Sequence, residues 1–188
     1  MEKRTKRAAL WAFFGFMMVA MTLTSCQNDD TKVAPKLTEQ TLVGTWETIG
    51  YTSNVTIAPL KKTVMVEVTM ADGVRKSLKV DGKEMPKEYE KYLQGLAENA
   101  MRLMLTGDKK FSQEVFSTEK KAWEFSSRGT YVFDQKAGTL TLNDEDGTKG
   151  VTKPTLLLSG VLLLNMGDDH SDDVLQFSDV TFTCKRIK

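Results

Sequence analysis

Residues 63–80 read TVMVEVTMADGVRKSLKV, and this stretch carries the strongest signal for the fold. In its first half, every second position (64, 66, 68 and 70) is apolar, which is the period of a β-strand with one buried face. The tripeptide Ala71-Asp72-Gly73 that follows is typical of a tight turn. A second alternating run then places Leu78 and Val80 on the inward face. We therefore predict a β-hairpin here.

The same alternation recurs towards the C-terminus. Short apolar or alternating runs predict further strands at residues 123–125, 130–134, 139–142, 155–158, 161–164, 174–177 and 180–184, with Gly129 as a bend between the first two. Eight to ten short, closely spaced strands are typical of an antiparallel β-barrel or β-sandwich. The predicted fold class is mainly β, with the barrel preferred.

One segment breaks the strand pattern. After Pro86, apolar residues fall at three- and four-residue spacing as far as Met104, which predicts an amphipathic helix of about 20 residues over 87–106. Pro86 suits the first turn of that helix, and Gly107 suits the position just beyond its end. The apolar face would plug or flank the barrel. Alternatively it would bind a ligand or partner through Leu93, Leu96, Met101 and Met104.

The N-terminus has the three parts of a secretory signal. Four basic residues lie within residues 1–7, an uncharged run covers 8–23, and Leu23-Thr24-Ser25-Cys26 follows. The run is short for a membrane-spanning helix, which needs about 20 residues, although an uncleaved signal anchor is an alternative. The last four residues resemble a bacterial lipobox. That resemblance implies diacylglyceryl transfer to the Cys26 thiol and cleavage before it.

These features divide the chain into a signal peptide (1–25), a lipidated tether (26–36) and one globular domain (37–188). Two or more acyl chains hold a domain stably at a bilayer, so a membrane is an expected partner. Cys26-Gln-Asn-Asp-Asp30 resembles the export signal of Bacteroidetes-type lipoproteins. This implies an outer-membrane location exposed at the cell surface; the periplasmic face is the alternative.

Composition excludes several classes of function. The 188 residues contain 26 Lys and Arg, 25 Asp and Glu, two Cys and one His, for a formal charge of +1. Such a balance argues against a nucleic-acid partner, which requires a marked basic excess. Two Cys exclude a disulfide-rich scaffold and a four-cysteine zinc site. Alternation in the last strand makes Cys184 a core residue rather than a nucleophile.

The single His lies in an acidic cluster that suggests two interpretations. Its candidate metal ligands are Asp168, Asp169, His170 and Asp172. Asp is also common in turns, so the alternative is an ordinary solvated loop. The chain has neither a glycine-rich phosphate loop nor a nucleophile-elbow motif. We therefore predict no cofactor and no catalytic activity.

The start of the domain, Leu42-Val-Gly-Thr-Trp-Glu47, resembles the Gly-x-Trp signature of lipocalins and related barrels. In that family the Trp closes the barrel base and an Arg from the last strand crosses it. The resemblance assigns these structural roles to Gly44, Trp46 and Arg186. Residues 123–142 are also similar to lipocalin-like lipoproteins of Bacteroidetes. The inserted helix is a departure, because lipocalins place their helix after the barrel.

The predicted function is that of a non-catalytic lipoprotein that binds a small apolar ligand or a protein or glycan partner. Small barrels can enclose one ligand when their inward side chains leave room. A docking module for envelope assembly is one alternative. A glycan hydrolase that uses two carboxylates is another.

Overall fold

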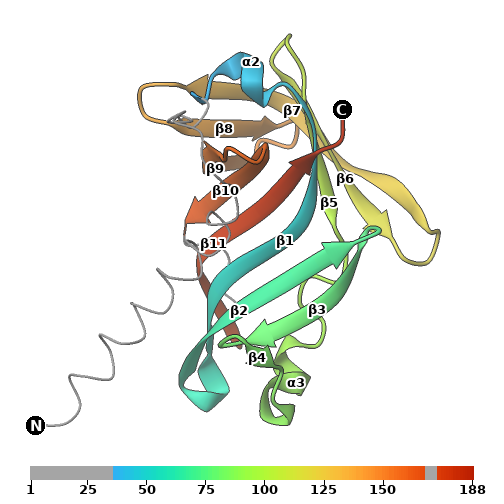
Figure 1. The fold of residues 1–188 in the computed structure, drawn as a ribbon, viewed down its shortest axis with the longest axis vertical. Coiled ribbons are helices and arrows are strands. Elements are labelled where there is room, and N and C mark those ends of the chain that lie inside the picture. The colour runs from blue at the N-terminus through green and yellow to red at the C-terminus, as the bar shows by residue number, and fades with distance from the viewer. Residues whose placement is uncertain (1–35, 168–172) are drawn as a thin grey trace, which may run out of the picture. The chain divides into compact units, whose positions relative to one another are not determined.

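The structure is a computed structural model that describes residues 36–167 and 173–188 (Figure 1). Nearly all of its regular structure is antiparallel β-strand. The strands are β1 (Gly44–Ile57), β2 (Lys62–Ala71), β3 (Val74–Val80), β4 (Lys83–Glu84), β5 (Met101–Leu105), β6 (Lys110–Ser117), β7 (Ala122–Asp134), β8 (Thr139–Asp144), β9 (Lys149–Leu156), β10 (Val161–Gly167) and β11 (Leu175–Arg186). Two short helices, α2 (Glu39–Leu42) and α3 (Lys87–Leu93), and a 3-10 turn (Ala58–Leu60) complete it.

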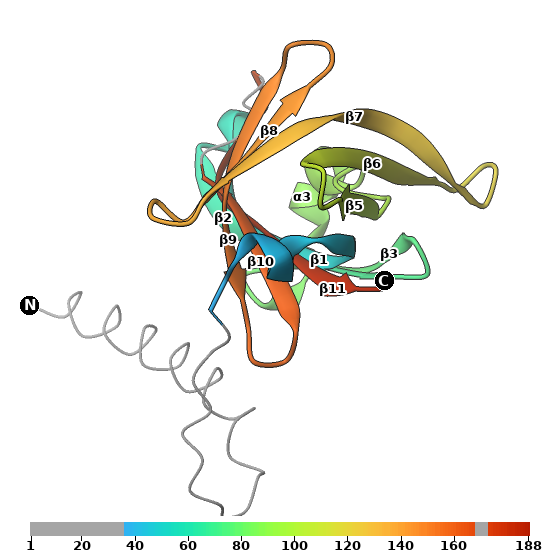
Figure 2. The same ribbon diagram turned by 90° about the horizontal axis from the view of Figure 1, so that it is seen from above.

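Eight of these strands close into a barrel, which confirms the predicted lipocalin-like architecture. Their order is β1-β5-β6-β7-β8-β9-β10-β11, and pairing of β11 with β1 closes the ring. Closure satisfies the backbone groups of every strand edge within the ring. Figure 2 shows the ring from above, with α3 inside its outline.

Strand β1 is long enough to belong to two sheets. One edge pairs with β11 over almost its full length, from Trp46 to Ile57. The other edge pairs first with β5, as far as Glu47, and then with β2 from Gly50 onwards. The β2–β3–β4 segment therefore extends the barrel wall beyond β5 instead of closing the ring.

The buried side chains form two cores within this wall. One contains Trp46 and lies between the barrel strands and α2. The other contains residues of β1, β2, β3 and α3, among them Val66 and Leu93. Phe182 packs against both cores. Helix α3 thus covers the second core and contributes nothing to the first, which leaves the interior beside Trp46 to the barrel strands.

The predicted hairpin over residues 63–80 is confirmed. Strands β2 and β3 pair in register, with Val66 opposite Val80 and Val68 opposite Leu78. Asp72 and Gly73 form the turn with positive φ angles of 54° and 81°. These angles match the right-handed twist of a two-residue hairpin.

The predicted extent of the inserted helix is wrong. Helix α3 ends at Leu93, and residues 101–105 form strand β5 instead. Ala97 has a φ of 42°, which breaks the helical path. The Arg75 guanidinium donates hydrogen bonds to the carbonyls of Gln94 (2.7 Å) and Leu96 (2.5 Å), so tertiary contacts stabilise the non-helical turn. Pairing of β5 with both β1 and β6 outweighs the local helical preference.

Other strand boundaries also differ from the prediction. The strand predicted at 155–158 overlaps only the last two residues of β9, which starts at Lys149. Strand β7 runs without interruption from Ala122 to Asp134, so Gly129 lies inside a strand and is not a bend. Strand β11 likewise joins two predicted strands into one. Register shifts in the ladders β6–β7 and β1–β11 absorb the breaks in alternation that suggested separate strands.

Candidate functional site: the barrel cavity

Helix α2 and Trp46 close one end of the barrel. A capping box between Thr38 and Thr41 stabilises the start of this short helix. The Trp46 indole is 1% exposed, and its Nε1 donates a 2.8 Å hydrogen bond to the Leu42 carbonyl. A carbonyl at the end of a helix has no partner within the helix, so the indole supplies it. We call this end, formed by α2 and the first residues of β1, the closed end.

Arg186 lies across the Trp46 ring, which is the arrangement that the lipocalin resemblance implies. The two residues are register partners on β11 and β1, and the guanidinium carbon lies 4.8 Å from the indole centroid. The same guanidinium donates hydrogen bonds to the carbonyls of Thr41 (2.5 Å) and Val43 (2.8 Å). A Cβ on Gly44 would lie 3.2 Å from Arg186 Nε and 2.7 Å from the Lys188 carbonyl, so a glycine leaves room for this contact.

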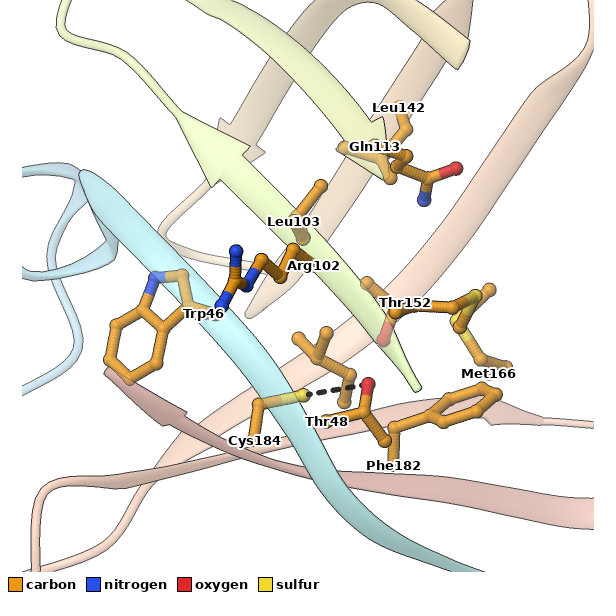
Figure 3. Close-up of a pocket in the computed structure, with 12 residues that line it drawn as sticks. Trp46, Thr48, Arg102, Leu103, Gln113, Leu142, Thr152, Met166, Phe182 and Cys184 are labelled. Carbon is orange, nitrogen blue, oxygen red and sulfur yellow. Dashed lines mark hydrogen bonds between the residues drawn. The ribbon is translucent and has the colours of Figure 1, made fainter. Parts of the chain in front are cut away.

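Above Trp46, the barrel interior contains a cavity of about 70 Å³ (Figure 3). Every barrel strand except β7 contributes to its wall. Trp46 and Cys184 lie at one end of the view, and Met166 and Phe182 lie at the other. Its volume corresponds to a few methylene groups, so the buried cavity alone accepts only the tip of an apolar molecule.

Next to this cavity lies a wider recess of about 510 Å³ that opens to solvent. The residues common to both spaces are Met101, Gln113, Leu142, Met166 and Phe182. Two unbranched methionines and an aromatic ring give a lining that can adapt to the shape of a ligand. We use the name calyx for the cavity and the recess together, which share these five lining side chains.

Only a few polar groups interrupt the apolar lining. The Gln113 amide oxygen accepts a 3.0 Å hydrogen bond from the Ser127 hydroxyl, which leaves the amide NH₂ group available as a donor. Thr152 donates to the Asn165 carbonyl at 2.9 Å. A mostly apolar pocket with a few placed polar groups is the usual composition of a small-molecule site.

The rim of the recess is formed by the β8–β9 hairpin. Asp144 and Lys149 contribute opposite charges to its lining. Arg128 of β7 holds the hairpin through a 2.9 Å ion pair with Glu145, and its carbonyl accepts a hydrogen bond from the Glu145 amide. A ligand held in the calyx would therefore meet Asp144 and Lys149 at the rim, and Arg102 is the one charged residue among the described residues that line the inner cavity.

Comparisons with known proteins give no family assignment for the chain. No family model matches the chain, and no curated protein is significantly similar to it. Within residues 36–167 and 173–188, no helix is long and apolar enough to cross a membrane.

The four residues predicted as one helical face do not lie on one face. Leu93 is fully buried in the core beneath α3, and Leu96 packs partly buried beside it. Met101 and Met104 belong to β5, where alternation directs Met101 into the calyx and Met104 to the outer surface. The prediction of a shared face is therefore wrong, because residues 101–105 are a strand.

The other predicted candidates have different outcomes. Cys26 and the acidic cluster of Asp168, Asp169, His170 and Asp172 lie outside the described residues. Among the residues that are described, no group of three metal-ligating side chains comes together. Sequence reasoning missed Gln113, Met166 and Phe182. Alternation along β6, β10 and β11 places them inward, but only closure of the ring shows that they meet.

Sequence reasoning also missed a charged cluster on the outer wall. Glu47 is 9% exposed and accepts hydrogen bonds from Arg102 Nε (3.0 Å) and Nη2 (2.9 Å), while Lys185 Nζ lies 3.5 Å away. The Arg102 guanidinium stacks 3.8 Å from the Trp123 ring centroid. These residues link β11, β1, β5 and β7, so the cluster stabilises the wall where β1 changes partners.

Cys184 lines the calyx as a protonated thiol. It is 3% exposed and contacts the Thr48 hydroxyl at 3.9 Å. Burial raises the pKa of this thiol from its ordinary value of 9.0 to about 11, against the opposing effect of the Thr48 hydrogen bond. The thiolate is the nucleophilic form, so Cys184 serves here as a small apolar wall residue.

The raised pKa of Cys184 predicts a loss of stability in alkaline solution. The folded protein holds the thiol proton more tightly than the unfolded chain, so this contribution is full below pH 9 and is lost as the pH rises towards 11. We expect the free energy of unfolding to fall by about 2 kcal/mol over this window. Urea unfolding at several pH values measures it. In Cys184→Ala this part of the dependence of the free energy of unfolding on pH should disappear. An unchanged pH dependence would contradict its assignment to the Cys184 thiol.

Proposed function

We propose that this protein is a lipid-anchored, non-catalytic binding protein whose calyx holds one end of a small apolar ligand. The observation that carries the proposal is an inner cavity and an open recess that lie side by side and share five lining side chains. Helix α3 lies against the other core and leaves this space open. The proposed relation to the lipocalin-like family rests on the Trp46–Arg186 contact and on the barrel topology.

The dimensions of the calyx limit the ligand. The inner cavity admits only a short apolar tip, while the recess accepts a larger body. The Gln113 amide can donate to an oxygen at the boundary between the two. Asp144 and Lys149 favour a polar end at the rim. These features together fit an amphipathic molecule with a short, slim apolar end.

The proposed anchor is the lipid on Cys26 at the outer membrane, with the domain exposed at the cell surface. The support for it is the N-terminal sequence, in which a lipobox-like tetrapeptide follows a short apolar run. Labelling of growing cells with a radioactive or clickable fatty acid tests it. Wild-type protein should be labelled and Cys26→Ala should not.

A hydrolase mechanism receives less support from the described residues of the calyx. Glycosidases use two carboxylates about 5–9 Å apart on either side of the scissile bond. Among the described residues that line the two spaces, Asp144 is the only carboxylate. Absence of catalysis stays a prediction, and turnover of surface glycans by the purified protein would contradict it.

Blocking the calyx tests the binding proposal. We expect Met166→Trp to fill the recess and to weaken binding of an apolar fluorescent probe by at least about tenfold, since the ring would occupy the volume that a ligand needs. Probe titration measures this effect. Native mass spectrometry of the wild type should also show a co-purified small molecule that the variant lacks.

Val132→Trp is the matched control, because Val132 lies on the outer face of β7 and is 54% exposed. Its probe affinity should stay within about twofold of the wild type. Equal binding by Met166→Trp and the wild type would place the ligand elsewhere. That result would favour the alternative function, in which the domain docks onto a macromolecule.

A further inference from the structure

The tip of the β9–β10 hairpin exposes two adjacent leucines. Leu158 is 60% exposed and Leu157 is 38% exposed, although both are large apolar residues. The turn itself is well formed, because the Leu157 amide donates to the Val161 carbonyl and the Gly160 amide donates to the Leu157 carbonyl. Nothing in the local geometry of the turn requires leucine at these positions. The exposed side chains therefore point to a contact outside the domain.

This tip lies at the closed end of the barrel. Val161, the first residue of β10, is in register with Lys185 of β11, and Arg186 is in register with Trp46 of β1. Neighbouring strands are about 4.8 Å apart, so the hairpin base lies roughly 10 Å from the start of β1. Strand β9 starts at the β8–β9 turn and ends at the β9–β10 turn, so the two hairpins lie at opposite ends of this strand. The leucines are thus at the end of the barrel opposite the rim of the calyx.

The proposed lipid anchor also joins the domain at the closed end. Lys36, the first described residue, precedes α2, and Leu37 packs against the core beneath it. Cys26 is ten positions before Lys36. Ten residues span at most about 35 Å when fully extended and roughly 17 Å on average when flexible. The tether therefore keeps the closed end within reach of the bilayer surface.

Most of the charged side chains at the closed end of the barrel are cations. Cations surround the closed end: Lys36, Lys109, Lys110, Lys185, Arg186 and Lys188. Two exposed carboxylates there, Glu39 and Asp108, are paired with Lys109 and Lys110, and a third, Asp134, accepts hydrogen bonds from the backbone of its own turn. The β8–β9 turn at the rim carries Asp144, Glu145 and Asp146. Anionic lipid headgroups would therefore attract the closed end.

We propose that the Leu157–Leu158 tip inserts into the surface of an anionic lipid bilayer beside the anchor, so that the calyx opens away from the membrane. The proposal rests on the lipid anchor proposed above. Apolar side chains at the headgroup boundary and basic residues around them are the two components of interfacial membrane binding. Two leucines bind weakly alone, but the anchor raises their effective concentration at the surface. The inserted tip sets the orientation of the barrel.

The direct test reads the environment of residue 158 in the anchored protein. Leu158→Cys is labelled with an environment-sensitive fluorophore (nitrobenzoxadiazole) on lipidated protein in vesicles of equal parts phosphatidylglycerol and phosphatidylcholine. Cys26 carries lipid and Cys184 is buried, so the label reports on one site. We expect a blue-shifted emission that nitroxides on the acyl chains quench. Phe125→Cys, which is similarly exposed on β7 but lies towards the other end of the barrel, should give a water-like signal. A water-like signal at residue 158 would overturn the proposal.

A second measurement separates this proposal from the anchor itself. The chain from residue 26 with Cys26→Ser keeps the compact unit Ala34–Lys188, and its flotation with the same vesicles is independent of lipidation. We expect Leu157→Ser/Leu158→Ser to lower its partition coefficient about tenfold and Phe125→Ser, at an exposed site towards the other end of β7, to leave it unchanged. Lys36→Glu/Lys188→Glu should also lower the partition coefficient, whereas Lys149→Glu at the rim should not.

The outcomes separate the two proposals. If fatty-acid labelling fails but the Cys26→Ser chain still floats with the vesicles as expected, only the lipid anchor is refuted. If the leucine variant instead changed the oligomeric state, a second copy would be the true partner and the proposal would be wrong.

Discussion

Trp46→Ala should destabilise the protein by about 3–5 kcal/mol, because it removes a fully buried indole and leaves a cavity at the closed end. The substitution also removes the hydrogen bond to the Leu42 carbonyl, so α2 should dissociate from the barrel more easily. Urea unfolding monitored by circular dichroism measures the change. A loss below about 1 kcal/mol would show that Trp46 is not part of the core.

Two companion variants separate the contributions at this end. Trp46→Phe keeps an aromatic ring but not the donor, so it should cost less than Trp46→Ala. Arg186→Ala should cost about 1 kcal/mol, because the guanidinium is exposed and its contact with the ring is of the cation–π type. In every variant that folds, probe binding in the calyx should stay close to the wild-type value, since the recess is lined by other residues.

Gly129→Ala should destabilise the protein by about 3 kcal/mol or more, because a methyl group at this position has no room. A Cβ on Gly129 would lie 2.0 Å from the Asn143 carbonyl oxygen and 2.9 Å from the Phe111 ring. The first of these atoms belongs to the backbone of β8, so the β7–β8 ladder must separate to relieve the contact. Thermal and urea unfolding both measure the loss.

Gly150→Ala is the matched control, since Gly150 also lies within a strand, β9. Its added Cβ would have no atom within 4 Å. This variant should unfold within about 0.5 kcal/mol of the wild type. Equal destabilisation by both substitutions would mean that the loss reflects glycine in a strand generally and not the close approach of β7 and β8.

The barrel class could be predicted because its cause is local and repeated. Alternation over residues 63–80 and in the C-terminal half requires one buried face on every strand, and a closed ring is a common way to bury all of them. The hairpin turn at Asp72-Gly73 is likewise decided by residues within the turn. Trp46 and Arg186 could be paired only by adding a family resemblance to this pattern.

The length of α3 could not be predicted in the same way. Residues 100–105 satisfy both a helical and a strand period, because Leu103 belongs to either pattern. The choice depends on β1 and β6, which offer backbone partners on both sides of β5. Strand β1 lies about 55 residues before β5 in the sequence and β6 about 10 residues after it. A short stretch of sequence around β5 therefore does not contain the pairing partners that decide between helix and strand.

The sequence by itself determined the strand-rich class, the turn chemistry and the buried state of Cys184. Each of these follows from neighbouring residues or from a short motif. Only the tertiary structure decided that Met101, Gln113, Leu142, Met166 and Phe182 share one calyx and that Leu157 and Leu158 lie at the end where the tether joins the domain. Such placements depend on strand order and register, which arise from contacts between residues far apart in the chain and have no local signature.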